Sequence, residues 1–120
     1  MKVLLSDDEL RLRKVIVLHL KKLNYEVIEA SNGLQAVEMA KNNNPDVIVL
    51  DIMMPEMDGL TACREIRKIE GFENKPIIML TAKATESDIQ EGLKNGASAY
   101  LTKPFSPKEL VDKIEELIKK

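Results

Sequence analysis

Two patterns in this 120-residue chain predict an α/β fold, and its size sets the number of domains. Short aliphatic runs alternate five times with longer stretches of helical periodicity, which is typical of a parallel sheet with helices on both faces. The third run, residues 47–50, is continuously branched and aliphatic, as in a strand buried on both sides. We therefore predict one domain over residues 1–120, a doubly wound (βα)5 sheet of strand order 2-1-3-4-5.

The first half of the chain gives two of these units. A strand is expected over residues 3–5, and the acidic segment 6–9 then suits the start of a helix that runs to about residue 23. A second strand covers residues 26–30, and Asn32 followed by Gln35 opens a helix to about residue 42. The residues of the first helix that should face the core recur at helical spacing: Leu12, Ile16, Leu20 and Leu23.

The second half gives the other three. Residues 46–51 form the third strand, residues 60–69 a helix, and residues 77–80 a strand that ends on Thr81. Thr85 and the three polar residues after it are expected to cap a helix closed by Gly96, and residues 99–102 form the last strand. Segment 106–109 is a capping box with proline at the first helical position. The helical residues expected to face the core are Ala62, Ile66, Ile69, Leu110, Ile114 and Leu117.

Composition excludes several classes of partner. Eighteen basic and 20 acidic residues give a net charge of −2, which favours neither direct nucleic-acid binding nor an anionic membrane surface. No apolar run approaches the ~18 residues of a membrane span, and no signal-peptide pattern is present. Cys63 is the only cysteine, so it has no internal disulfide partner. We expect a cytoplasmic protein, with Cys63 and the lone His19 as ordinary helix residues.

Charged and polar residues stand where four of the predicted strands end. Asp7 and Asp8 follow the first strand, Asp51 ends the third, Thr81 the fourth and Lys103 the fifth. The carboxyl ends of parallel strands form one edge of a sheet, where ligands bind in such folds. Each of these residues alone would be ordinary in a turn or at the start of a helix. Because all of them are expected at the same edge of the sheet, they indicate a functional site.

Three carboxylates at that edge repel one another unless one takes a proton or a cation binds. An oxygen-only ligand set suits Mg²⁺. We expect Asp8 and Asp51 to contact the ion directly, Asp7 directly or through water, and the backbone carbonyl of Met53 to supply a further oxygen. A carboxylate beside Mg²⁺ is a workable phosphoryl acceptor, so Asp51 is the predicted reactive group.

Two further strand-end residues fit that chemistry. Lys103 brings a compact positive charge over the edge, and the hydroxyl of Thr81 could donate to a phosphoryl oxygen on Asp51. Met53 and Lys83 flank the expected approach of water to Asp51 and would tune the lifetime of the phosphorylated state.

The chain resembles response-regulator receiver domains, the chemotaxis-regulator fold of two-component signalling, which is flavodoxin-like. The likeness covers the whole chain in order and spacing. It departs at Ser6, where the family usually has an apolar residue. It also departs at Ser98-Ala99, where winged-helix transcription regulators, which dimerise through the face of helices four and five, tend to carry an acidic residue. The residues that carry the likeness are Asp7-Asp8, Asp51-Ile52-Met53-Met54-Pro55 with Gly59, Thr81-Ala82, Tyr100 and Lys103-Pro104-Phe105.

The resemblance implies a set of roles. A histidine kinase or phosphotransfer protein would donate the phosphoryl group to Asp51, with Mg²⁺ held by the three aspartates. Thr81 and Lys103 would contact the phosphoryl group, Tyr100 would be an aromatic switch, and the peptide bond before Pro104 would be cis. Such a domain is regulatory rather than an enzyme with a separate substrate, although it catalyses its own phosphorylation and slow dephosphorylation.

Partners follow from the same resemblance. Phosphorylation would move Thr81 and Tyr100 and so change the surface of helix four, strand five and helix five, which a downstream protein or an output domain would read. A kinase would dock on a stripe of the first helix extended by the loop after strand five. The expected docking residues are Arg11, Val15, Leu18, Pro104 and Phe105, although Val15 and Leu18 fit the edge of the core equally well.

The same residues argue against four other functions. A flavodoxin-like electron carrier shares the strand order, but the acidic segment 6–9 would repel its phosphate. A phosphatase of the dehalogenase type needs a second aspartate two residues after the first, where this chain has Met53, and it needs room for a cap domain. A dinucleotide enzyme needs a glycine-rich fingerprint that is missing. A degenerate receiver would have lost acidic or lysine positions, and all are present.

Overall fold

The computed structural model describes residues 1–82 and 86–119, and in it all the strands belong to a single sheet. Every neighbouring pair is parallel, and the order is β2-β1-β3-β4-β5, so the predicted topology is confirmed. The strands are β1 (Lys2–Ser6), β2 (Glu26–Ala30), β3 (Val47–Asp51), β4 (Ile77–Thr81) and β5 (Ala99–Thr102).

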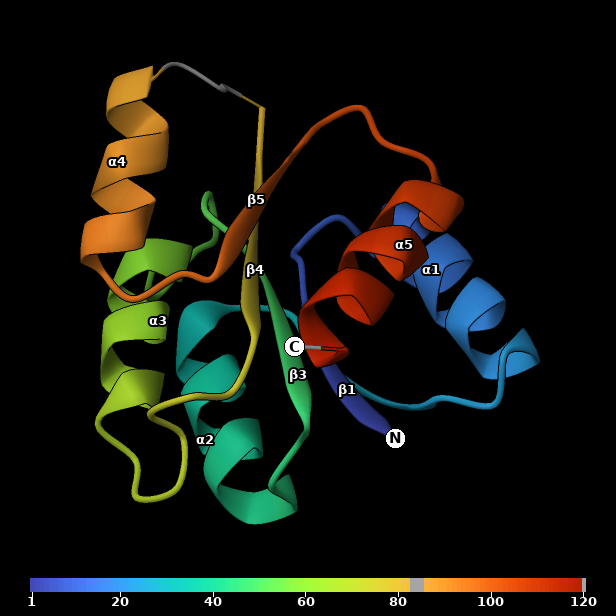
Figure 1. The fold of residues 1–120 in the computed structure, drawn as a ribbon, viewed down its shortest axis with the longest axis horizontal. Helices are drawn as coiled ribbons and strands as arrows, with labels where there is room; N and C mark the ends of the chain where they lie inside the picture. The colour runs from blue at the N-terminus through green and yellow to red at the C-terminus, as the bar shows by residue number, and fades with distance from the viewer. Residues whose placement is uncertain (83–85, 120) are drawn as a thin grey trace.

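Helices cover both faces of the sheet. Helices α1 and α5 lie on one face, and α2, α3 and α4 lie on the other (Figure 1). Right-handed connections between parallel strands force this two-sided arrangement when the chain order of strands reverses at β1 and β3. The helices are α1 (Leu10–Lys22), α2 (Gly33–Asn43), α3 (Gly59–Arg67), α4 (Glu86–Lys94) and α5 (Pro107–Ile118).

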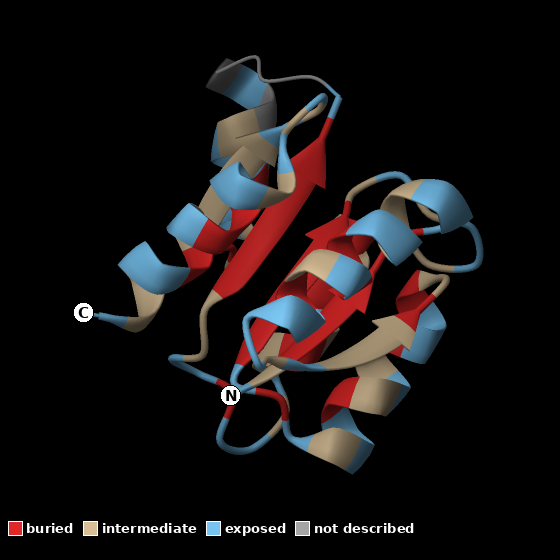
Figure 2. Cartoon of the chain, turned by 90° about the vertical axis from the view of Figure 1, so that its right-hand side faces the viewer, coloured by how far each residue is buried: buried red, intermediate tan, exposed pale blue. Residues whose placement is uncertain are grey.

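The sheet separates two hydrophobic cores. On β3, Ile48 and Leu50 face the core beneath α2 and α3, while Val47 and Val49 face the core beneath α1 and α5. All four are fully buried, because successive side chains of a strand point to opposite faces and both faces are covered. Figure 2 shows the buried strands between helices whose outer surfaces are exposed.

Most predicted boundaries agree with the structure within two residues. Leu23 is a correction: it was expected in the core, but α1 ends at Lys22 and Leu23 is 48% exposed as the C-cap. Helix α3 also ends two residues earlier than predicted, although Ile69 still packs against the core from the following turn. The predicted cap Thr85 lies outside the described residues.

Side chains fix the starts of three helices. Asn32 accepts a hydrogen bond from the backbone N–H of Gln35, and Asp58 accepts one from Thr61. Ser106 and Glu109 form the predicted capping box at α5. These bonds satisfy N–H groups that the helix itself leaves unpaired. The Gln35 side chain reaches the N–H of Ser31 rather than that of the cap residue, so α2 has only half of a capping box.

One arginine holds two loops together at the edge of the sheet where the strands begin. From α3, the guanidinium of Arg67 donates to the carbonyl oxygens of Phe72 and Lys75 in the loop before β4, at 2.8 and 2.6 Å. It also donates to Gly96 at 2.8 Å and to the Ser98 hydroxyl in the loop before β5. This edge is therefore fastened by α3, whereas the opposite edge carries the carboxylates.

Candidate metal centre

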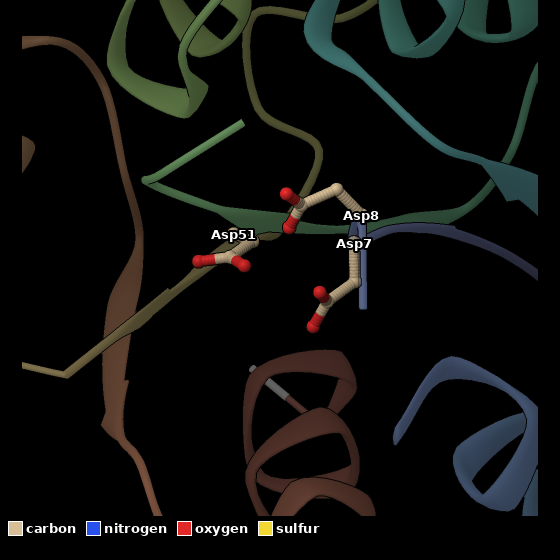
Figure 3. Close-up of side chains that lie close together, drawn as sticks. All are labelled: Asp7, Asp8 and Asp51. Atoms are coloured by element: carbon tan, nitrogen blue, oxygen red, sulfur yellow. The ribbon is translucent and has the colours of Figure 1, made fainter. Parts of the chain in front are cut away.

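The strand order brings Asp7 and Asp51 together. In the parallel pairing of β1 with β3, Ser6 lies opposite Leu50, so the next residues of the two strands, Asp7 and Asp51, leave the sheet side by side. Asp8 follows directly, and Figure 3 shows the three side chains gathered at this edge. One carboxylate oxygen from each lies within 4.8 Å of the others. The predicted convergence of the aspartates is thus what the structure contains.

Asp7 is the most constrained of the three. Its side chain is fully buried, its N–H donates to Ala30 of β2 at 3.1 Å, and its Oδ1 accepts from the N–H of Glu9 at 2.9 Å. Its other oxygen, Oδ2, has no hydrogen-bond partner among the described residues. The Lys103 ammonium stands 3.3 Å from this oxygen, and a buried carboxylate oxygen that accepts no hydrogen bond can also meet a metal cation.

Lys103 supplies the positive charge of the site. It follows β5, and its ammonium donates to Asp51 Oδ2 at 2.9 Å and stands 3.3 Å from Asp7 Oδ2. The lysine side chain is 20% exposed, so the two ion pairs are largely shielded from solvent. The peptide bond between Lys103 and Pro104 is cis, as the resemblance implied.

Burial raises the pKa of Asp51 to about 6. The ammonium of Lys103 opposes this shift, and the negative charge of Asp7 adds to it. Burial also lowers the pKa of Lys103, but the hydrogen bond and charge of Asp51, with those of Asp7, outweigh it and leave that pKa raised. A single lysine therefore does not balance the aspartates, which is the arrangement expected of a cation site.

The donor set fits a hard divalent cation. Three carboxylates, one of them with a buried oxygen that accepts no hydrogen bond among the described residues, match the oxygen ligands that Mg²⁺ takes in proteins, usually together with waters. Asp8 is exposed, which leaves that side of the group open to water. The N–H of Met53 donates to Asp51 Oδ1 at 3.3 Å, so the loop after β3 lies against this carboxylate. The side chain of Met53 is 76% exposed, and Lys83 lies outside the described residues.

Thr81 and Tyr100 stand on the two strands beyond β3. Thr81 ends β4 and is buried, one residue past the partner of Asp51 in the ladder, and its carbonyl accepts from the N–H of Lys103 at 2.7 Å. Tyr100 is half-buried on β5 and packs against the core beneath α2 and α3. A Cβ atom at Gly92 of α4 would overlap the Tyr100 hydroxyl, so glycine permits this close approach.

The predicted docking residues form an exposed surface. Val15 and Leu18 on α1 are 54% and 60% exposed, and Arg11 beside them is exposed as well. Pro104 is exposed, whereas Phe105 is half-buried against the core under α1 and α5. A cavity of about 310 Å³ lies between this loop and the start of α1. Its lining residues are Glu9, Leu12, Lys103, Pro104 and Phe105.

Sequence reasoning missed two residues that support the site. Arg13 of α1 donates to the backbone carbonyl of Asp7 at 2.6 Å, a contact that no sequence pattern indicates because it depends on how α1 packs. Ser6, expected to matter little, is fully buried, and its hydroxyl donates to the carbonyl of Asn32 at 3.3 Å and lies 3.0 Å from the Met54 sulfur.

Among the described residues, no helix is both long enough and apolar enough to span a membrane.

Known proteins resemble this chain over almost its full length. A family model described as the response regulator receiver domain matches residues 3–115. The transcriptional regulatory protein SrrA of Staphylococcus aureus is 42% identical over 118 residues, which cover 98% of this chain and 48% of SrrA. The chain thus spans about half the length of the curated relatives that it matches.

Solved structures agree with the family match. The chemotaxis protein CheY4 of Vibrio cholerae superposes with a TM-score of 0.93 at 34% identity, covering 97% of both chains. The receiver domain of the sensor histidine kinase PA1611 from Pseudomonas aeruginosa PAO1 gives a TM-score of 0.91 at 37% identity, covering 99% of this chain and 98% of that one. In that structure a magnesium ion is coordinated in the active site cleft.

Proposed function

The chain belongs to the response regulator receiver domain family, and from this we propose that it is a two-component signalling switch in which Asp51 accepts a phosphoryl group. The observation that carries the proposal is the group formed by Asp7, Asp8 and Asp51 with the Lys103 ammonium. The donor would be a phosphohistidine of a kinase or phosphotransfer protein.

The chemistry needs little from the protein beyond position and charge. An Asp51 oxygen attacks phosphorus while the bond from phosphorus to the histidine nitrogen breaks, so the product is an aspartyl phosphate and free histidine. We propose that Asp8, Asp51 and the Met53 carbonyl hold Mg²⁺, with Asp7 bound directly or through water. When bound, Mg²⁺ would neutralise negative charge on the transferring group.

The chain's own groups complete the site. The Lys103 ammonium, already 2.9 Å from Asp51 Oδ2, would shift to a phosphoryl oxygen when Asp51 becomes esterified. The Thr81 hydroxyl would donate to another of the oxygens, which pulls the end of β4 toward the site. Burial of Asp51 and Asp7 limits competing water, and this favours transfer over hydrolysis.

The switch would act on a surface rather than on a second substrate. Movement of Thr81 would leave room for Tyr100 to change its packing, and this would bias the surface of α4, β5 and α5 between two arrangements. A downstream protein or an output domain would read that surface. The protein is thus regulatory, and we propose that its only catalysis is on its own Asp51, in the cytoplasm.

Incubation with acetyl phosphate and Mg²⁺, followed by intact mass measurement, tests the proposal. The wild-type chain should gain one phosphoryl group, and this gain should be lost in Asp51→Ala and on chelation with EDTA. Glu56→Gln is a matched control, because it removes an exposed carboxylate from the same loop outside the cluster. Equal uptake by Asp51→Ala, or uptake that EDTA does not change, would contradict the proposal.

Kinase choice is a second, separable part of the proposal. The exposed Val15 and Leu18, together with Arg11, lie on the face of α1 near the Pro104–Phe105 loop, where a partner could reach Asp51. Exchanging these three side chains for those of another receiver should change which kinase phosphorylates the chain and leave uptake from acetyl phosphate intact. Unchanged kinase preference would place the docking surface elsewhere.

A further inference from the structure

We propose that Arg13 is a positioning residue for the metal-binding carboxylates, acting through the backbone of Asp7 rather than by touching the ion. The inference rests on the proposed magnesium site. It goes beyond that site because Arg13 carries a positive charge, which a cation site would ordinarily exclude, and contributes geometry instead.

The guanidinium of Arg13 joins three elements. Its Nη1 donates to the carbonyl oxygen of Asp7 at 2.6 Å, and its Nε donates to Glu29 Oε1 of β2 at 3.0 Å. The Arg13 side chain is only 13% exposed, and that of Glu29 is 28% exposed. A planar guanidinium held at two of its nitrogens has little freedom, so α1 and β2 together fix the position of the Asp7 carbonyl.

That carbonyl lies where the sheet no longer provides a donor. Strand β1 ends at Ser6, and the Asp7 N–H is the last to reach β2, at Ala30. Helix α1 begins only at Leu10, and its N-cap Glu9 makes no side-chain capping bond within the described structure. The short link between strand and helix carries both Asp7 and Asp8, and Arg13 is what fixes its backbone oxygen.

Fixing this oxygen sets the direction of two ligands at once. The Asp7 carbonyl and the Asp8 N–H belong to one planar peptide unit. Its rotation determines ψ of Asp7 and φ of Asp8, and hence where both Cα–Cβ bonds point. Asp7 Oδ1 is already bonded to the N–H of Glu9, so a defined peptide plane leaves Oδ2 aimed at the site.

The charge of Arg13 is balanced on its far side. Glu29 accepts from both Arg13 and Lys14, and although burial raises its pKa, these two cations outweigh burial and leave that pKa lowered, so the glutamate stays ionised. The Arg13–Glu29 pair is therefore close to neutral as seen from the carboxylates. This separates a geometric role from an electrostatic one, and Lys14 provides the matched comparison: it contacts Glu29, but Arg13 is the residue bonded to Asp7.

The test compares Arg13→Met with Lys14→Met in the full chain. Each substitution removes one positive charge and one contact to Glu29. We expect Arg13→Met to weaken Mg²⁺ binding roughly tenfold, as is usual when the support of a metal ligand is removed, and Lys14→Met to change it less than twofold. Isothermal titration calorimetry with MgCl₂ alone, well below the unfolding temperature, measures this without any phosphoryl donor.

A charge-conserving variant completes the design. Arg13→Lys keeps the charge but cannot donate in two directions from one plane, so its Mg²⁺ affinity should fall between those of wild type and Arg13→Met. Thermal unfolding in EDTA provides the stability of each variant. A purely structural role would lower the unfolding temperature and leave the Mg²⁺ dissociation constant unchanged.

Two failures are distinguishable. If the wild-type chain binds no Mg²⁺, the proposed function itself is overturned. If wild type binds but Arg13→Met and Lys14→Met have the same affinity, the positioning role is overturned and the magnesium site stands.

Discussion

At the scale of single residues, Asp51 is the most informative group because its burial opposes its charge. Its pKa is about 6 in the folded chain against an ordinary value of 3.8. The folded protein therefore binds this proton more tightly than the unfolded one, and without metal the free energy of unfolding falls as pH rises from about 4 to about 6. Above that range the cost of the charge is fully present.

Asp51→Asn should consequently stabilise the metal-free chain. At pH 7 in EDTA we expect a gain of about 1–3 kcal/mol in the free energy of unfolding, since the amide carries no charge, and a smaller gain at pH 5. Urea denaturation at both pH values measures this. Asp112→Asn is the control, because Asp112 pairs with Lys108 at the surface and should change stability by less than about 0.5 kcal/mol. A variant less stable than wild type at pH 7 would contradict the prediction.

At this scale, the site residues that could be predicted from the sequence are those that follow directly after a strand. Asp7, Asp8, Asp51 and Lys103 were predictable together because each follows a recognisable strand, and topology alone brings those ends to one edge. Arg13 was not predictable: its contact depends on the rotation of α1 about its axis and the rotamer of a long side chain. The roles of the predicted residues in phosphoryl transfer stay predictions until they are measured.

At the scale of elements, α4 and β5 approach each other closely at Gly92 and Tyr100. Gly92 of α4 lies so near the Tyr100 hydroxyl that a methyl group there would overlap it. The glycine is buried within a helix, where alanine would normally be the better residue. Glycine at this position lowers the stability of the helix, but it leaves the space that the Tyr100 ring occupies.

The effect of Gly92→Ala on the free energy of unfolding should change sign with the residue at position 100. In wild type we expect it to lower the free energy of unfolding by about 1–3 kcal/mol, because the Tyr100 ring must leave its place. In a Tyr100→Ala background the clash is gone, and the same change should stabilise by about 0.5–1 kcal/mol. Chemical denaturation of the four proteins of this double-mutant cycle measures the coupling. Equal effects in both backgrounds would show that the contact carries no energy.

Elements were predicted more reliably than their ends. Strands β2 and β5 were predicted with their observed bounds, since each is a short stretch between clear turn residues. Leu23 was misplaced because the helical spacing continues one residue past Lys22, where α1 ends before the chain turns at Asn24, whose φ is 68°. Hydrophobic periodicity identifies which face of a helix is buried, but it does not identify the residue at which the helical hydrogen bonds end.

At the scale of the whole molecule, both hydrophobic cores pack against the same sheet, so we expect them to unfold together. Ile48 belongs to the core under α2 and α3, and Ile78 to the core under α1 and α5, and both are fully buried. The strands that carry them, β3 and β4, are paired directly. Disruption of either core should therefore weaken the same cooperative transition.

Ile48→Ala and Ile78→Ala should each lower the free energy of unfolding by about 2–5 kcal/mol. Both variants should still unfold in a single step, with circular dichroism and tyrosine fluorescence giving the same midpoint. Leu18→Ala, at a side chain that is 60% exposed, is the control and should change stability by less than about 0.5 kcal/mol. Separate midpoints for the two probes would mean that the two cores unfold independently.

The pairing of β1 with β3 also has a practical consequence. These strands are neighbours in space, although α1, β2 and α2 separate them along the chain. A backbone cut between α2 and β3 would leave Asp7 and Asp8 on one fragment and Asp51 with Lys103 on the other. Each fragment would carry half of an ion pocket, so magnesium would favour complementation of the two pieces. The domain could then be rebuilt as a split reporter whose reassembly depends on a divalent ion.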